Sequence, residues 1–307
     1  MEATRVAYGM ALAEYGSDER IIVLDADLSC CTMTEYFAKK YPERFLNCGI
    51  AEANMVGVSA GLATCGAVPF ANSFAMFIAG RCYEQIRNSV AYPNLNVKLV
   101  GTHAGVSVGE DGATHQCLED LGIMRVIPNM TVLSPCDSEE TKQAVRAMID
   151  HIGPVYLRLG RAPIANIPEA DAIEFEIGKA KQIRSGDDIT IAATGIMVGM
   201  AMEAAKLLQQ EGVKARVLNF HTIKPLDESA IYRAVQETRG IVVAEEHNIK
   251  TGLGSAIAEY TSTQCPTTMR FVAVKDTFGR SGKAEELLEY FNLTSAAIVS
   301  AAQDILR

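Results

Sequence analysis

The stretch FLNCGIAEANMVGVSAGLATCGAVPFANSFAMFIAGR, residues 45–81, decides the fold. It contains no charged side chain between Glu52 and Arg81, and it is longer than the roughly 20 apolar residues that cross a bilayer. Gly66 and Pro69 interrupt the stretch and indicate a turn. The stretch therefore predicts a buried helix, a turn, a short buried strand and a second helix. Glu52 would begin the first helix, where the helix dipole favours a carboxylate.

Composition and charge limit the class of protein. The chain has 307 residues, of which 49% are hydrophobic and 21% charged, enough for two globular domains. A net charge of −9 without a basic cluster argues against nucleic-acid binding. Eight cysteines without a C-x-x-C pattern are typical of reduced thiols rather than disulfides or a zinc site. Residues 1–20 do not resemble a signal peptide. We therefore expect a cytoplasmic protein with no membrane segment and no metal ligands of its own.

Short strand patterns alternate with helical patterns along the chain. Apolar runs predict buried parallel strands at residues 20–27, 96–103, 131–135, 154–160, 188–195, 214–221, 240–247 and 270–276. A helix is expected at 138–152, where apolar residues repeat at helical spacing through Ile152 and where Asp137 and Glu140 resemble a capping box. This alternation predicts an α/β fold. We expect two α/β domains with mainly parallel sheets flanked by helices, at 1–165 and 181–307, joined by a linker at 166–180.

Several nucleotide-binding and hydrolase motifs are incomplete. TGLGSAIAE, residues 251–259, begins like a dinucleotide fingerprint but has Ile257 where close packing needs a smaller residue. FGRSGKAEE, residues 278–286, lacks the first glycine and the hydroxyl of a phosphate-binding loop. These departures argue against a nicotinamide enzyme and a nucleotide hydrolase. A site role for EEH at 245–247 stays open. Three histidines stand alone and are expected to be structural: His151, His221 and His247.

The loop GTHAGVSVGEDGATHQ, residues 101–116, contains the densest group of candidate catalytic side chains in the sequence. It follows a predicted buried strand, and open α/β sheets bind ligands at the carboxyl ends of their strands. It offers two imidazoles, His103 and His115, and two carboxylates, Glu110 and Asp111, while its glycines let the backbone approach a ligand. These groups suit proton transfer near neutral pH, although a solvated loop is the alternative.

Four segments together resemble transketolase: GIAEANM at 49–55, SFAMFIAGRCYEQIRNS at 73–89, the loop at 101–116, and PVYLRLGRAP at 154–163. They are similar to the pyrimidine-binding domain of that family, and residues 243–259 and 275–294 are similar to its C-terminal domain. The resemblance covers essentially the whole chain, but the G-D-G pattern of the family's pyrophosphate- and magnesium-binding domain is missing. The chain therefore resembles the second subunit of a split, two-chain transketolase.

The resemblance implies thiamine diphosphate as cofactor, with its Mg²⁺ ligands on the partner chain. Glu52 matches the catalytic glutamate that bonds the N1′ atom of the aminopyrimidine. An apolar pocket favours a protonated carboxyl group, and sharing that proton activates the cofactor as an electron sink. Phe74 and Phe77 match aromatics that stack on the pyrimidine, and Asp27 matches an aspartate near the cofactor and the subunit contact.

The resemblance also implies which residues bind the substrate. His103 and His115 match catalytic histidines that hydrogen-bond the hydroxyl groups of the donor sugar and the reaction intermediate. Asp111 matches a carboxylate that recognises a sugar hydroxyl by hydrogen bonding. Arg161, and more weakly Arg5, match arginines that bind the sugar phosphate, a role suited to the guanidinium fork.

Three positions depart from the family pattern. Ala53 stands where a histidine often follows the glutamate, Gly80 stands where a third pocket aromatic is common, and Cys31 stands where a serine can contact the phosphate. These changes do not affect cofactor activation. They leave open which sugar is the donor and whether it must be phosphorylated.

The implied reaction is the transfer of a two-carbon ketol unit from a ketose to an aldose. Such a transferase would be active only with the N-terminal partner subunit that carries the pyrophosphate domain. The small residues between Gly57 and Ala63 would let helices approach closely, so we expect two copies to pair within a heterotetramer. Two alternatives remain: a subunit of the deoxyxylulose-phosphate-synthase or 2-oxo-acid dehydrogenase beta type, and a non-catalytic assembly or regulatory subunit.

Overall fold

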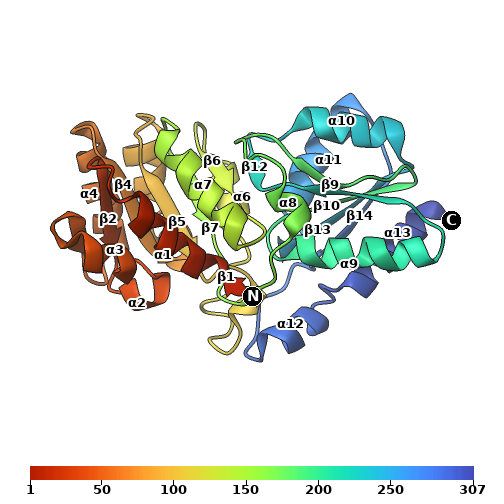
Figure 1. Cartoon of the computed structure of the whole chain (residues 1–307), viewed down its shortest axis with the longest axis horizontal. Helices are drawn as coiled ribbons and strands as arrows, with labels where there is room; N and C mark the ends of the chain where they lie inside the picture. The colour runs from red at the N-terminus through yellow and green to blue at the C-terminus, as the bar shows by residue number, and fades with distance from the viewer.

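The computed structural model describes residues 1–307, apart from the side chain of Asp171. Two lobes lie side by side, each built around a β-sheet, with the N-terminus between them and the C-terminus at the far end of the second lobe (Figure 1). Mainly parallel strands flanked by helices form both lobes, which confirms the predicted fold class. The predicted domain and linker boundaries stay predictions.

The first sheet has, within the described residues, the strand order β12–β6–β7–β5–β4–β2–β3. Its strands are β2 (Ile21–Asp25), β3 (Phe45–Asn47), β4 (Val68–Phe74), β5 (Lys98–Thr102), β6 (Thr131–Leu133), β7 (Val155–Arg158) and β12 (Thr222–Lys224). All pair in parallel except β12, which runs antiparallel to β6. The carboxyl ends of the parallel strands therefore share one edge, the usual place for a ligand in an α/β sheet.

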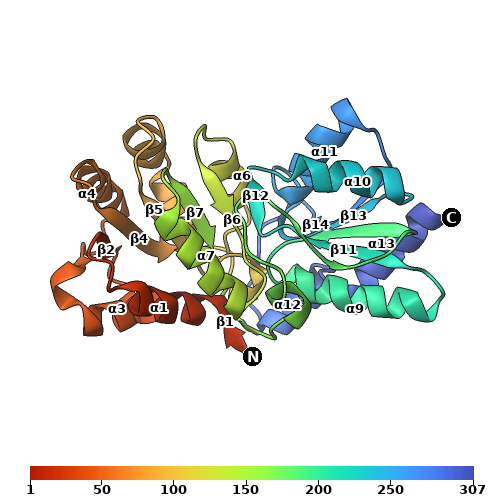
Figure 2. The ribbon, with the colours of Figure 1, turned by 45° about the horizontal axis from the view of Figure 1, so that its top comes forward.

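Helices cover both faces of the first sheet (Figure 2). One face packs against α1 (Thr4–Tyr15), α3 (Glu35–Lys40) and α7 (Ser138–Asp150). The other packs against α4 (Glu52–Thr64), α6 (Asp120–Arg125) and two π-helical turns, Met76–Arg81 and Ile86–Ala91, that flank α5 (Tyr83–Gln85). Shorter pieces are α2 (Ser29–Thr32) and the 3₁₀ turns Pro42–Arg44 and Val106–Val108.

The second sheet has, in the described part of the chain, the order β14–β13–β10–β11–β9, with β9 antiparallel. Its strands are β9 (Lys181–Arg184), β10 (Ile189–Ala193), β11 (Ala215–Asn219), β13 (Ile241–Asn248) and β14 (Met269–Val274). Its helices are α9 (Met197–Gln210), α10 (Glu228–Glu237), α11 (Leu253–Gln264), α12 (Ala284–Tyr290) and α13 (Ser295–Leu306). Between the lobes lie α8 (Pro168–Asp171) and the short pair β1 (Glu2–Ala3) and β8 (Pro163–Ile164).

Each of the eight predicted strand segments contains a strand, but the predicted helix at 138–152 differs in detail. The Asp137 carboxylate accepts a hydrogen bond from the Glu140 backbone N–H at 2.9 Å, as a helix cap. The Glu140 carboxylate, however, accepts from the Cys136 N–H at 2.8 Å, so the predicted capping box is not reciprocal. The helix ends at Asp150, and Ile152, expected on its apolar face, is 82% exposed.

The opening stretch forms a helix, a turn and a fully buried strand as predicted, followed by a π-helical turn. The prediction that the whole first helix is buried is wrong. Only the side of α4 that touches the sheet is buried, while its outer side carries the half-exposed Val58. A Cβ atom added at Gly57 or Gly61 would meet nothing within 4 Å. Among the described residues, no helix is long and apolar enough to span a membrane.

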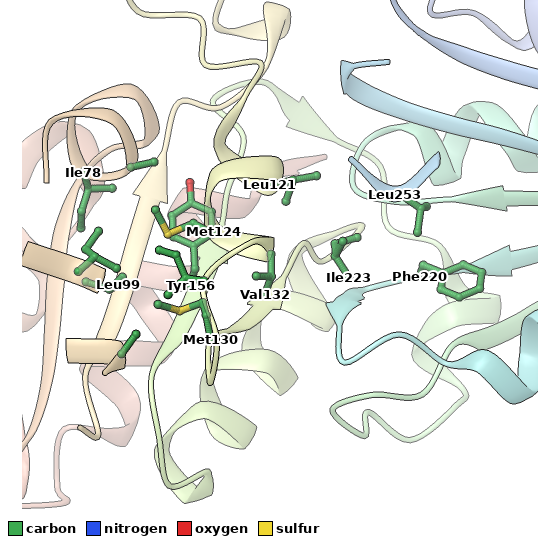
Figure 3. Packing of buried hydrophobic residues seen from close by; sticks show 14 of the residues in the cluster. Ile78, Leu99, Leu121, Met124, Met130, Val132, Tyr156, Phe220, Ile223 and Leu253 are labelled. Atoms are coloured by element: carbon green, nitrogen blue, oxygen red, sulfur yellow. The ribbon is translucent and has the colours of Figure 1, made fainter. Parts of the chain in front are cut away.

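The two lobes share one hydrophobic cluster (Figure 3). Val132 and Leu121 of the first lobe belong to the same buried cluster as Phe220 and Leu253 of the second. Ile223, on β12, lies in this cluster too. Strand β12, which comes from the second half of the chain, also completes the edge of the first sheet. The β12 side of the first sheet is therefore packed against the second lobe.

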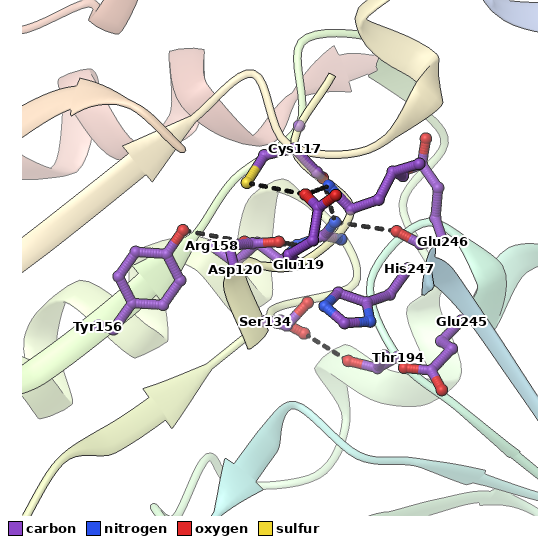
Figure 4. Close-up of polar contacts among 12 residues, drawn as sticks. Cys117, Glu119, Asp120, Ser134, Tyr156, Arg158, Thr194, Glu245, Glu246 and His247 are labelled. Atoms are coloured by element: carbon purple, nitrogen blue, oxygen red, sulfur yellow. Dashed lines mark hydrogen bonds and ion pairs between the residues drawn. The ribbon is translucent and has the colours of Figure 1, made fainter. Parts of the chain in front are cut away.

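A buried ion pair reinforces this contact (Figure 4). Arg158, at the end of β7, contacts the fully buried Asp120 through Nε at 2.9 Å, and the Tyr156 hydroxyl donates to the same carboxylate at 2.9 Å. Burial lowers the pKa of Arg158, but the carboxylates of Asp120 and Glu246 raise it further, so its pKa lies above the usual value. Arg158 also donates to the Glu246 backbone carbonyl at 2.9 Å, which joins β7 to β13.

Candidate active site

Glu52 is a buried carboxylate at the start of a helix. It is the first residue of α4, which follows β3 at the edge of the first sheet, and its side chain is 2% exposed. The N-terminal end of α4 favours a negative charge at this position. Arg81, at the end of the π-helical turn, donates from Nη1 to Glu52 Oε2 at 2.8 Å. The structure thus pairs Glu52 and Arg81, the two charged residues at either end of the uncharged part of residues 45–81.

Four rings from two distant segments form one cluster. Phe74, at the end of β4, stacks on Phe77 with ring centroids 5.6 Å apart. His103, after β5, stacks on Phe74 at 3.9 Å, and His115 lies 5.3 Å from Phe77. The Arg81 guanidinium lies over the Phe77 ring at 4.9 Å. Because Arg81 also contacts the buried carboxylate, the aromatic cluster and that carboxylate belong to one site.

The loop at 103–116 is folded by residues with positive φ. His103, Gly105, Gly109 and Gly112 have φ values of 58°, 85°, 89° and 77°. Glycine adopts this left-handed region without strain, whereas a residue such as His103 rarely does. The Gln116 amide holds the loop by donating to two of its carbonyls and to the Arg280 carbonyl in the second lobe.

Glu246 supports the same loop from the second lobe. It is buried in β13, accepts a hydrogen bond from the Ser107 N–H, and packs so tightly on Gly105 that a Cβ there would collide with its carboxyl group. Sequence reasoning missed a G-x-S-x-G pattern at 105–109, the spacing of a hydrolase nucleophile motif. Ser107 is 3% exposed in a 3₁₀ turn, not at a strand-to-helix turn where such a nucleophile would be exposed.

The segment EEH at 245–247 is structural. The Glu245 carboxylate accepts from the N–H groups of Leu253 and Gly254 at the start of α11, at 2.7 and 2.9 Å. His247 donates from Nδ1 to the Asn248 carbonyl oxygen at 2.8 Å. Together with the contact of Glu246 to the loop, these bonds give the segment a supporting role in the fold.

His103 is held in its neutral form. It is 3% exposed, and its Nδ1 lies 3.0 Å from the Thr102 hydroxyl. Burial lowers the pKa of His103 to about 3, with further lowering by the positive charges of Arg5 and Arg161. His103 can therefore donate or accept hydrogen bonds without carrying a charge.

Two arginines make a positive pocket beside the ring cluster. Arg5, on α1, donates to the Cys31 carbonyl at 2.6 Å, and Arg161 donates to the Val108 carbonyl. Among the described residues neither guanidinium forms an ion pair with a carboxylate, and Arg5 Nε is buried without a partner. Both line a pocket of about 360 Å³ that Lys283 and one carboxylate, Glu110, also line, so cationic side chains predominate there. This pocket suits an anionic group.

Asp27 and Asp111 lie apart from the ring cluster. Asp27 follows β2, the neighbour of β4, and accepts from the Asn47 amide at 2.9 Å. Asp111 is exposed at the tip of the loop.

Sequence reasoning did not assign Arg81 to the site, and it did not predict that Glu246 bonds the loop backbone. For Arg81 the available signal was its place as the next charge after Glu52. Within the described residues, no group of three or more His, Cys, Asp and Glu side chains is arranged to hold a metal ion.

Comparisons with known proteins agree with this geometry. Residues 1–165 match the model of the transketolase pyrimidine-binding domain, and residues 178–298 match that of the transketolase C-terminal domain. A putative transketolase C-terminal section of Methanocaldococcus jannaschii is 47% identical over 99% of this chain and 96% of that protein. A 6-deoxy-6-sulfo-D-fructose transketolase subunit of Clostridium sp. is 45% identical over 98% of this chain and 94% of that protein.

Two further comparisons concern chain length and fold. A solved structure described as a split gene transketolase, inactive beta4 tetramer, has a TM-score of 0.93 and 47% identity, covering 100% of this chain and 99% of that chain. Human transketolase is 39% identical over 99% of this chain, but the match spans only 49% of the human protein.

The chain belongs to the transketolase family. Within that family it corresponds to the C-terminal section, a transketolase subunit and so part of a transferase. The predicted family and enzyme class are confirmed. The relatives' names favour a transketolase over the alternative families based on 2-oxo acids.

Replacing His103 with Gln should make the protein less sensitive to acid. The folded-state pKa of His103 is about 3, below the unfolded value, so between pH 7 and 5 the unfolded state gains a proton that the folded state cannot bind. The wild type should therefore lose about 2 kcal/mol more unfolding free energy than His103→Gln over this range. Urea unfolding at both pH values measures the difference. The control is His115→Gln, on the same loop but half-buried. Equal losses in wild type and His103→Gln would contradict the neutral state of His103.

Proposed function

We propose that this chain is the pyrimidine-binding half of a thiamine-diphosphate-dependent transketolase. It works only with a partner chain that binds the diphosphate and Mg²⁺. The observation that carries the proposal is Glu52, a carboxylate 2% exposed beside stacked aromatic rings at the carboxyl edge of a parallel sheet. A buried carboxylate needs a compensating partner. In the free chain that partner is the half-exposed Arg81, and the ring of the cofactor offers one with which Glu52 can share a proton.

The residues around Glu52 fit an aminopyrimidine. When bound, thiamine diphosphate supplies a carbon nucleophile and takes up the electron pair of the bond that breaks in the ketose. Glu52 shares a proton with N1′ of the pyrimidine, and Phe74 and Phe77 provide ring faces for it. Asp27 follows β2, the strand that pairs with β4, and we assign it to the cofactor side of the site and to the subunit contact.

The sugar substrate lies on the other side of the ring cluster. His103 and His115 hydrogen-bond its hydroxyl groups. His103 does so as an uncharged imidazole, because its pKa is about 3. Asp111, at the exposed tip of the loop, contacts a further hydroxyl. Arg5 and Arg161 bind an anionic end of the sugar, since neither guanidinium pairs with a carboxylate among the described residues.

An anionic sugar agrees with the names of two relatives. One is a transketolase subunit for 6-deoxy-6-sulfo-D-fructose, and another, from Phocaeicola vulgatus and 36% identical, is an apulose-4-phosphate transketolase subunit. A sulfonate and a phosphate each present oxygens that an arginine fork can bind. We infer that the physiological ketose or aldose of this chain also carries such a group.

Two copies of the chain pair, and partner chains complete each site in a heterotetramer. Support comes from the outer side of α4, where Gly57 and Gly61 face open space and Val58 is 37% exposed. Obligate interfaces are more hydrophobic than transient ones. Support also comes from the related split transketolase, described as an inactive tetramer of beta chains.

Replacing Glu52 with Gln should abolish ketol transfer by the reconstituted complex. Without a proton to share, the rate should fall at least about 100-fold, a typical loss for acid–base catalysis. The assay uses the natural partner, thiamine diphosphate and Mg²⁺, with a panel of phosphorylated and plain ketoses and aldoses. Glu14→Gln, an exposed change on α1, is the control.

Two results of this assay would contradict the proposal. Unchanged activity of the Glu52→Gln complex would favour the non-catalytic assembly or regulatory subunit. Thiamine-dependent decarboxylation of pyruvate without ketol transfer would favour an enzyme that starts from a 2-oxo acid.

Replacing Val58 with Arg should prevent pairing of the chain. A charge on the outer side of α4 cannot be buried against a second helix without a counter-charge. Sedimentation of the co-expressed complex should then show loss of the heterotetramer. Leu207→Arg, on α9, is a matched control because both side chains are 37% exposed. A Val58→Arg complex of unchanged mass would contradict this interface.

A further inference from the structure

Arg81 touches the proposed cofactor site at two points. Its Nη1 donates to Glu52 Oε2 at 2.8 Å, and its guanidinium carbon lies 4.9 Å from the centroid of the Phe77 ring. The proposed function assigns this carboxylate and this ring to the aminopyrimidine of the cofactor. Arg81 therefore occupies the position where that ring is expected.

A guanidinium group and an aminopyrimidine offer similar contacts. Both are planar, both stack on an aromatic face, and both can meet a carboxyl group through a nitrogen in their plane, the guanidinium by donating an N–H and the pyrimidine N1′ by sharing a proton. One face of Phe77 and one edge of the Glu52 carboxylate can serve either group. They cannot serve both at the same time, so the two groups compete.

The two partners of the ion pair differ in freedom. Glu52 is 2% exposed and fixed in the first turn of α4, whereas the Arg81 side chain is 51% exposed. Among the described residues, Arg81 makes no other side-chain hydrogen bond or ion pair. A half-exposed ion pair is weak. Arg81 can therefore turn into solvent, while Glu52 stays in place.

We propose that Arg81 is a cofactor-site residue that holds the place of the aminopyrimidine until the cofactor displaces it. This inference rests on the function proposed above. Before the cofactor binds, Arg81 compensates the buried charge of Glu52. The same contact lowers the apparent affinity for the cofactor, because only the fraction of molecules with Arg81 turned away can bind it.

Binding measurements test the competition. Isothermal titration of the assembled complex with thiamine diphosphate and Mg²⁺ should give a Kd about fivefold lower for Arg81→Met than for the wild type. Methionine has a similar length but cannot donate a hydrogen bond. The ratio of the two Kd values should shrink at high salt, which screens the ion pair. Arg87→Met is the control, since Arg87 is exposed and donates to its neighbour Asn88.

A double-mutant cycle in the cofactor-free chain tests the pair itself. Arg81→Met should lower the urea midpoint of the wild-type chain, because it leaves Glu52 without a counter-charge, and it should have no effect in the Glu52→Gln background. Equal effects of Arg81→Met in both backgrounds would overturn the proposal.

The outcomes separate this inference from the proposed function. Tight binding by the wild type with an equal or higher Kd for Arg81→Met would overturn the role of Arg81 alone. A wild-type complex that binds no thiamine diphosphate would overturn the proposed function and this inference together. A lower Kd for Arg81→Met, with Arg87→Met unchanged, supports both.

Discussion

A carboxylate removed from water must find a compensating partner, and the arrangement around Glu52 follows from this constraint. Glu52 begins α4 at the carboxyl edge of a parallel sheet, so the helix dipole supplies part of the compensation. The remaining compensation comes from Arg81 in the free chain. The stacked rings of Phe74, Phe77 and His103 exclude water from this side of the site. The same constraint lets the site bind a flat ring that shares a proton with the Glu52 carboxyl group.

The second lobe contributes order rather than reacting groups. Glu246 holds the backbone of the loop that carries His103 and His115, and Gln116 ties this loop to the Arg280 carbonyl. Arg158, fixed by Asp120 within the first lobe, joins the lobes by donating to the Glu246 carbonyl. Because His103 has a positive φ, its position depends on this support. The shared hydrophobic cluster and β12 extend the same connection through the core.

The sequence was informative wherever a pattern reflects burial. Continuous apolar runs marked the parallel strands, and the loop after β5 followed from strand order and glycine content. The outer side of α4 could not be predicted from sequence, because small apolar residues look the same whether they face a sheet or a missing partner. The Glu140 carboxylate was expected to accept from the Asp137 N–H but accepts from the Cys136 N–H, one residue earlier. Which of these donors is used depends on tertiary geometry. The contact between Arg81 and Glu52 spans 29 positions and depends on a π-helical turn that has no sequence signature.

The most direct test of this account is a structure of the assembled complex with thiamine diphosphate and Mg²⁺. The account predicts a pyrimidine nitrogen within about 3 Å of the Glu52 carboxylate, with the ring over Phe77 and the diphosphate held by the partner chain. A bound cofactor whose ring lies elsewhere, with Glu52 still paired to Arg81, would contradict it.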